Sequence, residues 1–123
     1  MKVLLSIKPE FANKIFAGEK LYEYRKSVFK EHITTIVVYA SRPVQRIIGE
    51  LEVEEVIQGT PDKIWQMTSE QSGISRTYFS EYFGGRSRAY AIKIAKCNRY
   101  KRAINPYKKY ANFTPPQSFC YLN

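Results

Sequence analysis

The segment from residue 44 to residue 58 constrains the fold more than any other, because its side chains alternate over a long run. Positions 49, 51 and 53 carry Gly, Leu and Val, whereas positions 50, 52 and 54 carry glutamate, so an extended chain would have one apolar and one acidic face. The alternation shifts phase between Glu54 and Glu55. One extra residue at that point makes a β-bulge, which bends long strands around barrels. The segment therefore predicts a long, bent, half-buried strand.

Shorter elements around this strand predict a mixed sheet with few helices. Apolar and β-branched runs predict strands at residues 3–7 and 34–40, and alternation predicts another at 88–97. Apolar residues at helical spacing predict a helix from Pro9 to Ala17, and two short helices are predicted between residues 60 and 85, capped by Thr60 and Ser75. The aromatic, proline-rich end predicts a last strand or strap. Residues 1–123 are thus expected to form one α+β domain, a small mixed β-barrel flanked by short helices.

Positive charge is concentrated in the second half of the chain, which has a net charge of +9 overall. Residues 61–123 hold eleven Lys and Arg against three Asp and Glu, and tyrosines are interleaved with the basic residues from 86 to 110. This pattern favours a nucleic acid as partner, because phosphates bind cations and bases stack on aromatic rings. A basic surface kept for solubility is the alternative. The side chains predicted to hold the nucleic-acid backbone are Arg86, Arg88, Lys93, Lys96, Arg99, Lys101 and Arg102.

Cysteine and histidine are too sparse to predict a metal centre. Cys97 and Cys120 lie 23 positions apart, and neither has a second cysteine or a histidine at the spacing of metal ligands. We expect two reduced thiols in a cytoplasmic protein, with no metal and no cofactor. The sequence also has no apolar run near 18 residues, so no membrane partner is expected.

The short stretch GEKLYEYRK, residues 18 to 26, combines charges and aromatic rings directly after a glycine. On a regular strand Glu23 and Arg25 share a face with Leu21, which predicts that this face points inward. An oppositely charged couple is tolerated in a confined place and offers directed acceptors and donors to a ligand. The alternative is an exposed ladder of charges with a weak ion pair.

This stretch resembles the signature of the ASCH (activating signal cointegrator homology) domain: Gly, one residue, Lys, two residues, Glu, one residue, Arg. The matching positions are Gly18, Lys20, Glu23 and Arg25, and the flanking LLSIKPEFANKIFAGEK, YASRPV, IIGELEVEEV, SRTYFSEYFGG, AYAIKI and PPQSF also match. The chain is therefore similar to a small bacterial or phage subgroup of the family over nearly its whole length.

The resemblance implies a PUA-like β-barrel with a helix-flanked cleft, in an RNA- or nucleic-acid-associated module. The signature side chains Lys20, Glu23 and Arg25 would line the cleft and bind the ligand. Further ligand-binding side chains are expected at neighbouring strand ends and in the closing motif. These are Lys8, Tyr39, Ser41, Gln117 and Ser118.

Some members of this family are enzymes, which leaves a catalytic alternative open, with Lys20 and Glu23 as its candidate catalytic residues. One branch hydrolyses N4-acetylcytidine with the signature lysine and a threonine, but Glu23 stands at the threonine position here. A carboxylate beside Lys20 is expected to keep that lysine protonated, which is unfavourable for a nucleophile or a base. RNA cleavage without a metal, using Lys20, Tyr22 or Tyr24, and Ser41, is the other enzymatic interpretation. A third is an adaptor for an acidic protein.

Overall fold

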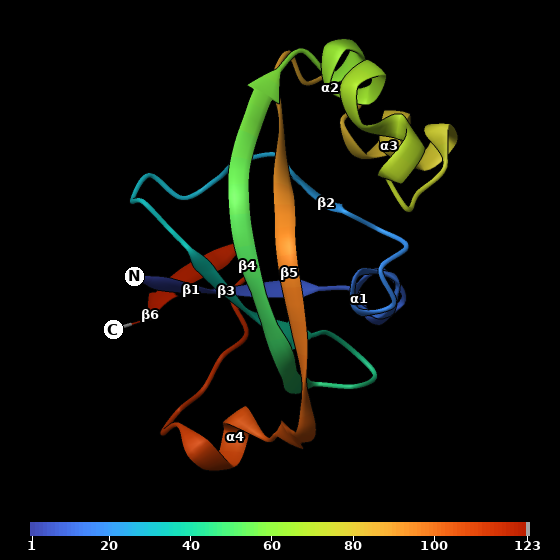
Figure 1. The fold of residues 1–123 in the computed structure, drawn as a ribbon. Coiled ribbons are helices and arrows are strands. Elements are labelled where there is room, and N and C mark those ends of the chain that lie inside the picture. Colours follow the sequence, from blue (N-terminus) through green and yellow to red (C-terminus); the bar gives the residue numbers. More distant parts are fainter. Residues whose placement is uncertain (123) are drawn as a thin grey trace.

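One strongly curled sheet of six strands forms the body of the protein in this computed structural model, which describes residues 1–122 (Figure 1). The spatial order is β2-β5-β4-β3-β1-β6, with β1 and β3 parallel and the other neighbours antiparallel. The predicted α+β class with a mixed, barrel-like sheet is confirmed. The strands are β1 (Lys2–Ile7), β2 (Tyr22–Arg25), β3 (Thr35–Ala40), β4 (Arg46–Gly59), β5 (Ala89–Ile104) and β6 (Phe119–Leu122).

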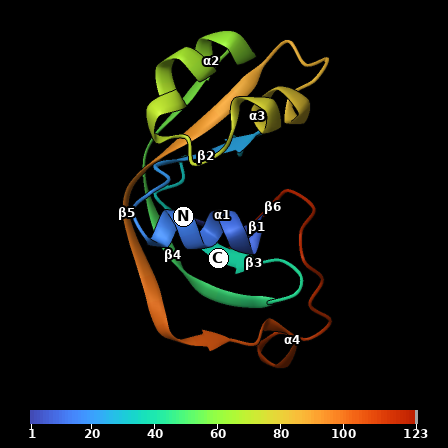
Figure 2. The same cartoon turned by 90° about the vertical axis from the view of Figure 1, so that its right-hand side faces the viewer.

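The two long strands β4 and β5 run antiparallel and give the sheet its curl (Figure 2). Their register shifts between Glu52 and Val53 and again between Val53 and Glu55, so the predicted bulge is confirmed close to the expected position. The predicted faces of β4 are also confirmed, because Leu51 is 1% exposed whereas Glu52 faces solvent. Strand β5 extends seven residues beyond the predicted strand end at residue 97.

Short helices flank the sheet: α1 (Pro9–Phe16), α2 (Pro61–Thr68), α3 (Arg76–Tyr82), α4 (Pro106–Lys109) and a 3₁₀ turn, η1 (Ser69–Gln71). Thr60 Oγ1 accepts from the Lys63 N–H and Ser75 Oγ from the Tyr78 N–H, as expected of N-caps. Helices α2 and α3 cover one end of the curl, whereas α4, which the sequence analysis did not predict, lies at the other end (Figure 2). No helix within residues 1–122 is long and apolar enough to cross a membrane.

The C-terminal segment returns to the sheet as the edge strand β6 beside β1, which confirms the predicted last strand. Phe119 packs edge-on against Phe29 with ring centroids 5.8 Å apart. The main core fills the concave side between β1, β3, β4 and α1. Trp65 belongs to a second core cluster, where its ring lies 4.9 Å from that of Phe79, so it serves packing.

Between residues 1 and 122 the sheet remains open between its edge strands β2 and β6. A side chain spans this opening in place of a backbone ladder. Arg25 on β2 donates one hydrogen bond to the Ser6 carbonyl on β1, at 3.1 Å, and another to the Ser118 carbonyl just before β6, at 3.0 Å. Arg25 thus ties the edges of the curl together, and the candidate site lies beside it.

Candidate functional site

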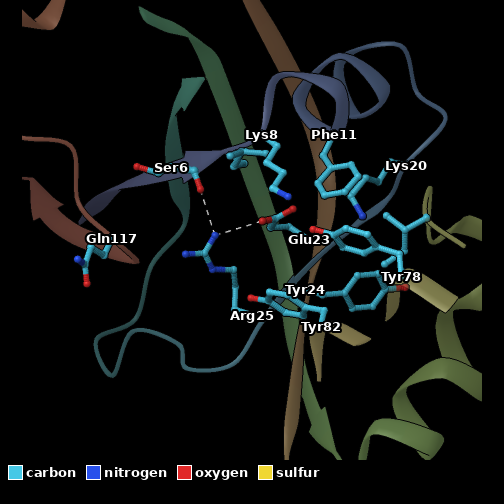
Figure 3. Close-up of a pocket in the computed structure, with 12 residues that line it drawn as sticks. Ser6, Lys8, Phe11, Lys20, Glu23, Tyr24, Arg25, Tyr78, Tyr82 and Gln117 are labelled. Carbon is cyan, nitrogen blue, oxygen red and sulfur yellow. Dashed lines mark hydrogen bonds and ion pairs between the residues drawn. The ribbon is translucent and has the colours of Figure 1, made fainter. Parts of the chain in front are cut away.

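A pocket of about 200 Å³ opens between the end of β1, helix α1, strand β2 and helix α3 (Figure 3). Its walls combine three cationic side chains, one carboxylate and several aromatic rings. The volume is below that of a typical drug-sized pocket, so it suits a single ring with its substituents. The lining residues are Ser6, Ile7, Lys8, Phe11, Lys20, Glu23, Tyr24, Arg25, Ile74, Tyr78, Tyr82 and Gln117.

Lys20 reaches this pocket from the turn that ends α1. Gly18 permits the turn with a φ of +80°, and the Lys20 N–H donates to the Lys14 carbonyl. Only 1% of Lys20 is exposed, and its Nζ donates to the Ser72 carbonyl at 2.6 Å. Gly73 leaves room for the lysine stem, since a Cβ at that position would lie 2.6 Å from the Cβ of Lys20.

Burial changes the protonation chemistry of Lys20. Desolvation lowers its pKa to about 8, and the positive charge of Lys14 acts in the same direction, whereas Glu23 raises it. Glu23 therefore acts in the expected direction, but the loss of water outweighs the attraction of the carboxylate and brings the Lys20 pKa closer to neutral pH than the sequence analysis expected. The Nζ also lies 4.8 Å from the ring centre of Tyr24 and 5.4 Å from that of Phe11. These ring faces stabilise a cation that has lost its hydration.

Glu23 and Arg25 form the inward-facing couple that the strand alternation predicts. Arg25 Nη1 lies 3.3 Å from Glu23 Oε2, and the two side chains are 11% and 7% exposed. Within the described chain the second oxygen, Oε1, has no hydrogen-bond donor beside it, and it is not sealed from solvent. The pocket therefore offers a carboxylate oxygen as an acceptor next to a fixed guanidinium.

Strand β2 is buried on both faces, so its tyrosines also contribute. Tyr24 lines the pocket, and its hydroxyl shares a hydrogen bond of 2.7 Å with Thr68 Oγ1. Desolvation raises the Tyr24 pKa to about 12. Tyr78 and Tyr82, which stack with ring centroids 6.4 Å apart, form the α3 wall. The sequence analysis predicted a helix here but did not identify these two tyrosines as pocket residues, although their i, i+4 spacing places them on one helix face.

The structure brings most of the predicted cleft residues together. Lys8, Lys20, Glu23, Arg25 and Gln117 all line the pocket, and the Ser118 carbonyl binds Arg25. Ser41 does not line it. Ser41 instead lies in a neighbouring shallow hollow that shares Lys8 with the pocket.

The predicted cleft position of Tyr39 is wrong. Tyr39 is 2% exposed and lies in a separate aromatic cluster, where its hydroxyl shares a 2.7 Å hydrogen bond with that of Tyr107. Strand alternation explains the difference, because Tyr39 falls on the same sheet face as Val37, and the C-terminal segment covers that face through Phe113. Desolvation raises the Tyr39 pKa to about 12, with Arg46 and Arg42 partly opposing the shift.

The basic stretch lies outside the pocket, and several of its charges have partners. Lys93 Nζ lies 3.0 Å from Glu54 Oε2, and Lys96 lies opposite Glu52 in the β4–β5 register. Arg99 donates to Asn13 Oδ1 at 2.9 Å, and Arg88 donates to Gln58 Oε1 at 3.4 Å. Arg86, Lys101 and Arg102 are exposed. The glutamates of β4 therefore neutralise part of the positive charge of residues 86–102, which do not form a continuous cationic surface.

Comparison with known proteins gives close relatives over the whole length of the chain. A Zymomonas mobilis protein described as an ASCH domain-containing ribonuclease is 32% identical over 125 residues, covering 98% of this chain and 84% of the relative. The crystal structure of ASCH from Zymomonas mobilis superimposes with a TM-score of 0.92 at 30% identity, covering 99% of this chain and 87% of that chain. A crystal structure of a tyrosine-to-phenylalanine mutant of that protein gives the same TM-score at 29% identity, covering 99% and 90%.

The model of the ASCH domain family matches residues 5–116, which include the signature positions Gly18, Lys20, Glu23 and Arg25. The match spans the strands that build the pocket and the helices that flank it. The fold, the signature and the relatives agree, and the chain belongs to the ASCH domain family.

Proposed function

We propose that this protein binds RNA and that its pocket takes one unpaired nucleotide. The observation that carries the proposal is the set of buried Lys20, buried Glu23 and largely buried Arg25, which faces a hollow of ring size beside stacked tyrosines. Proteins read RNA mostly through unpaired bases that stack on aromatic rings and use their edges for hydrogen bonds. The net charge of +9 and a relative described as a ribonuclease support the same partner.

Each wall of the pocket has a suitable partner on a nucleotide. Glu23 Oε1 would accept a hydrogen bond from a ring N–H or an exocyclic amine, as carboxylates do with cytosine N4. Tyr78 and Tyr82 offer ring faces for stacking. Lys8, whose Nζ lies 5.3 Å from the ring centre of Tyr78, stands where a phosphate attached to the stacked nucleotide would be neutralised.

Replacing Tyr82 by leucine is expected to weaken RNA binding by about 1–3 kcal/mol, roughly 5- to 150-fold, because one base loses its stacking surface. The measurement is fluorescence anisotropy of a labelled single-stranded RNA titrated with protein. Tyr110→Leu is the matched control, since Tyr110 is exposed and lies outside the pocket. Equal losses in the two variants, or no RNA binding by the wild type at low salt, would contradict the proposal.

RNA cleavage in the same pocket is a second candidate function, favoured by the lowered pKa of Lys20, about 8. Neutral Lys20 would accept the proton of a ribose 2′-hydroxyl while that oxygen attacks the adjacent phosphorus. The bond from phosphorus to the 5′-oxygen breaks, which leaves a 2′,3′-cyclic phosphate and a free 5′-hydroxyl after protonation. Cationic side chains around the pocket would stabilise the extra negative charge on the phosphoryl oxygens.

Lys20→Met is expected to abolish cleavage of labelled RNA while leaving the protein folded, because methionine fills the same space without a base. Gel analysis of the products, with detection of the cyclic phosphate by mass spectrometry, is the measurement. Lys63→Met is the control, since Lys63 is exposed and lies outside the lining of the pocket. Cleavage that persists unchanged in Lys20→Met would remove Lys20 from this role, and intact RNA with the wild type would restrict the function to binding.

A further inference from the structure

We propose that the RNA backbone leaves the pocket across Lys8 and enters the neighbouring hollow beside Ser41 and Arg42, rather than following strand β5. The inference rests on the proposed function, because it describes where the phosphates next to the bound nucleotide lie. It also replaces the sequence-based assignment of the backbone contacts to residues 86–102.

The hollow is built where two parallel strands end. Strands β1 and β3 run side by side, so their carboxyl ends, at Ile7 and Ala40, meet at the same edge of the sheet. The Ser41 N–H donates to the Ile7 carbonyl at 3.0 Å, which fixes the chain after β3 against the start of the loop into α1. The resulting hollow is shallow and open to solvent, with a volume of about 580 Å³. Its lining residues are Lys8, Pro9, Glu10, Ser41, Arg42 and Pro43.

Lys8 connects this hollow with the nucleotide pocket, because it lines both. If one base of an RNA chain occupies the pocket, the next phosphate of that RNA reaches the hollow without crossing another helix or strand of the protein. The hollow supplies the groups that hold phosphates in nucleic-acid complexes, namely lysine, arginine and a serine hydroxyl. The only carboxylate among its lining residues, Glu10, is exposed to solvent.

The cations of the hollow are free, whereas part of the positive charge on β5 lies against carboxylates of β4, and Lys101 and Arg102 further along β5 are exposed. In the part of the chain that the structure describes, Lys8 and Arg42 form no ion pair, and both are exposed. Arg42 and Arg46 both lie close enough to Tyr39 to act on its hydroxyl, so positive charge continues beyond the hollow. On β5, by contrast, Lys93 is paired with Glu54. A free cation can bind a phosphate directly, whereas a paired cation must first break its interaction with the carboxylate, which weakens phosphate binding.

The test compares Arg42→Ala with Lys96→Ala, which removes an exposed cation from β5. Binding of a labelled single-stranded RNA of about 12 nucleotides, a length within the range of known sites, is measured over a series of salt concentrations. Arg42→Ala is expected to reduce affinity several-fold and to lower the slope of log K against log salt by about 0.7, the loss of one phosphate contact. Lys96→Ala is expected to retain the wild-type slope and affinity. Thermal unfolding verifies that both variants are folded.

Three other outcomes would overturn the inference, each in a recognisable way. A reduced slope in Lys96→Ala with an unchanged slope in Arg42→Ala would place the backbone along β5. Unchanged slopes in both, with binding still weakened by Tyr82→Leu, would exclude Arg42 and Lys96 as phosphate contacts and leave the pocket intact. Absence of RNA binding by the wild type would remove the proposed function and this inference with it.

Discussion

Replacing Arg25 by leucine is expected to lower the free energy of unfolding by about 3–5 kcal/mol, which is a large share of the stability of a small domain. The cause is the carboxylate of Glu23, which is 7% exposed and would lose the guanidinium that lies 3.3 Å from its Oε2. The carbonyl groups of Ser6 and Ser118 would also lose their donor, so the open edges of the sheet would lose their bridge.

Urea unfolding of Arg25→Leu and Arg76→Leu compares the stability lost when a buried ion pair and an exposed ion pair are broken. Arg76 lies 3.1 Å from Asp62, a distance similar to that of the buried pair, but these side chains are 50% and 82% exposed. Exposed pairs contribute about 0–1 kcal/mol, so Arg76→Leu should change stability little. A similar decrease in unfolding free energy in the two variants would contradict the view that the buried ion pair stabilises the fold more than an exposed one.

A double variant tests whether the cost arises at Glu23. If Glu23 is the uncompensated charge, Arg25→Leu combined with Glu23→Gln should be more stable than the sum of the two single losses indicates. Additive losses would instead assign the effect of Arg25 to the carbonyl groups of Ser6 and Ser118. The comparison therefore divides the role of Arg25 between neutralising the pocket and joining the sheet edges.

Local sequence patterns predicted most of the fold because β-strand alternation and helix caps depend on neighbours in the chain. The alternation of residues 49 to 54 located the faces of β4, and the change of phase located its bulge. Thr60 and Ser75 marked two helix starts for the same reason. Helix α4 also begins with a capping residue, Asn105, followed by Pro106. With only four residues, however, the helix was too short to be recognised within the basic C-terminal segment.

Features of the site that depend on distant segments could not be predicted from the sequence. The acceptor of Lys20 is a backbone carbonyl 52 residues away, so nothing near the signature indicates that the lysine is buried. The predicted position of Tyr39 failed because the cover on its sheet face comes from Phe113. Similarly, Lys93 is paired with Glu54 because of the β4–β5 register, which the sequence does not reveal. The sequence therefore overestimated how many cations of the basic stretch are unpaired.

Burial of Lys20 is expected to make the protein more stable as pH rises through 8, by about 1.4 kcal/mol per pH unit. The folded-state pKa of about 8 lies below the ordinary value of 10.5 that applies to the unfolded chain. Between these values the unfolded state holds a proton that the folded state has released, so unfolding becomes less favourable as pH increases. Below pH 8 both states are charged and the contribution is constant. It stops rising near pH 10.5, where the unfolded lysine also loses its proton.

The measurement is the unfolding free energy of the wild type and Lys20→Met from pH 7 to pH 9.5, analysed as the difference between the two proteins. This upper limit matters because burial raises the pKa of Tyr24 and that of Tyr39 to about 12, so these tyrosines cost stability above pH 10 as the unfolded chain ionises. The stability of the wild type relative to Lys20→Met should stay level up to pH 8 and then rise. Lys63→Met, which removes an exposed lysine outside the lining of the pocket, should instead follow the wild type. A difference that is flat through pH 9.5 would show that Lys20 keeps its ordinary pKa, and such a lysine would be charged throughout and unable to act as a base in RNA cleavage.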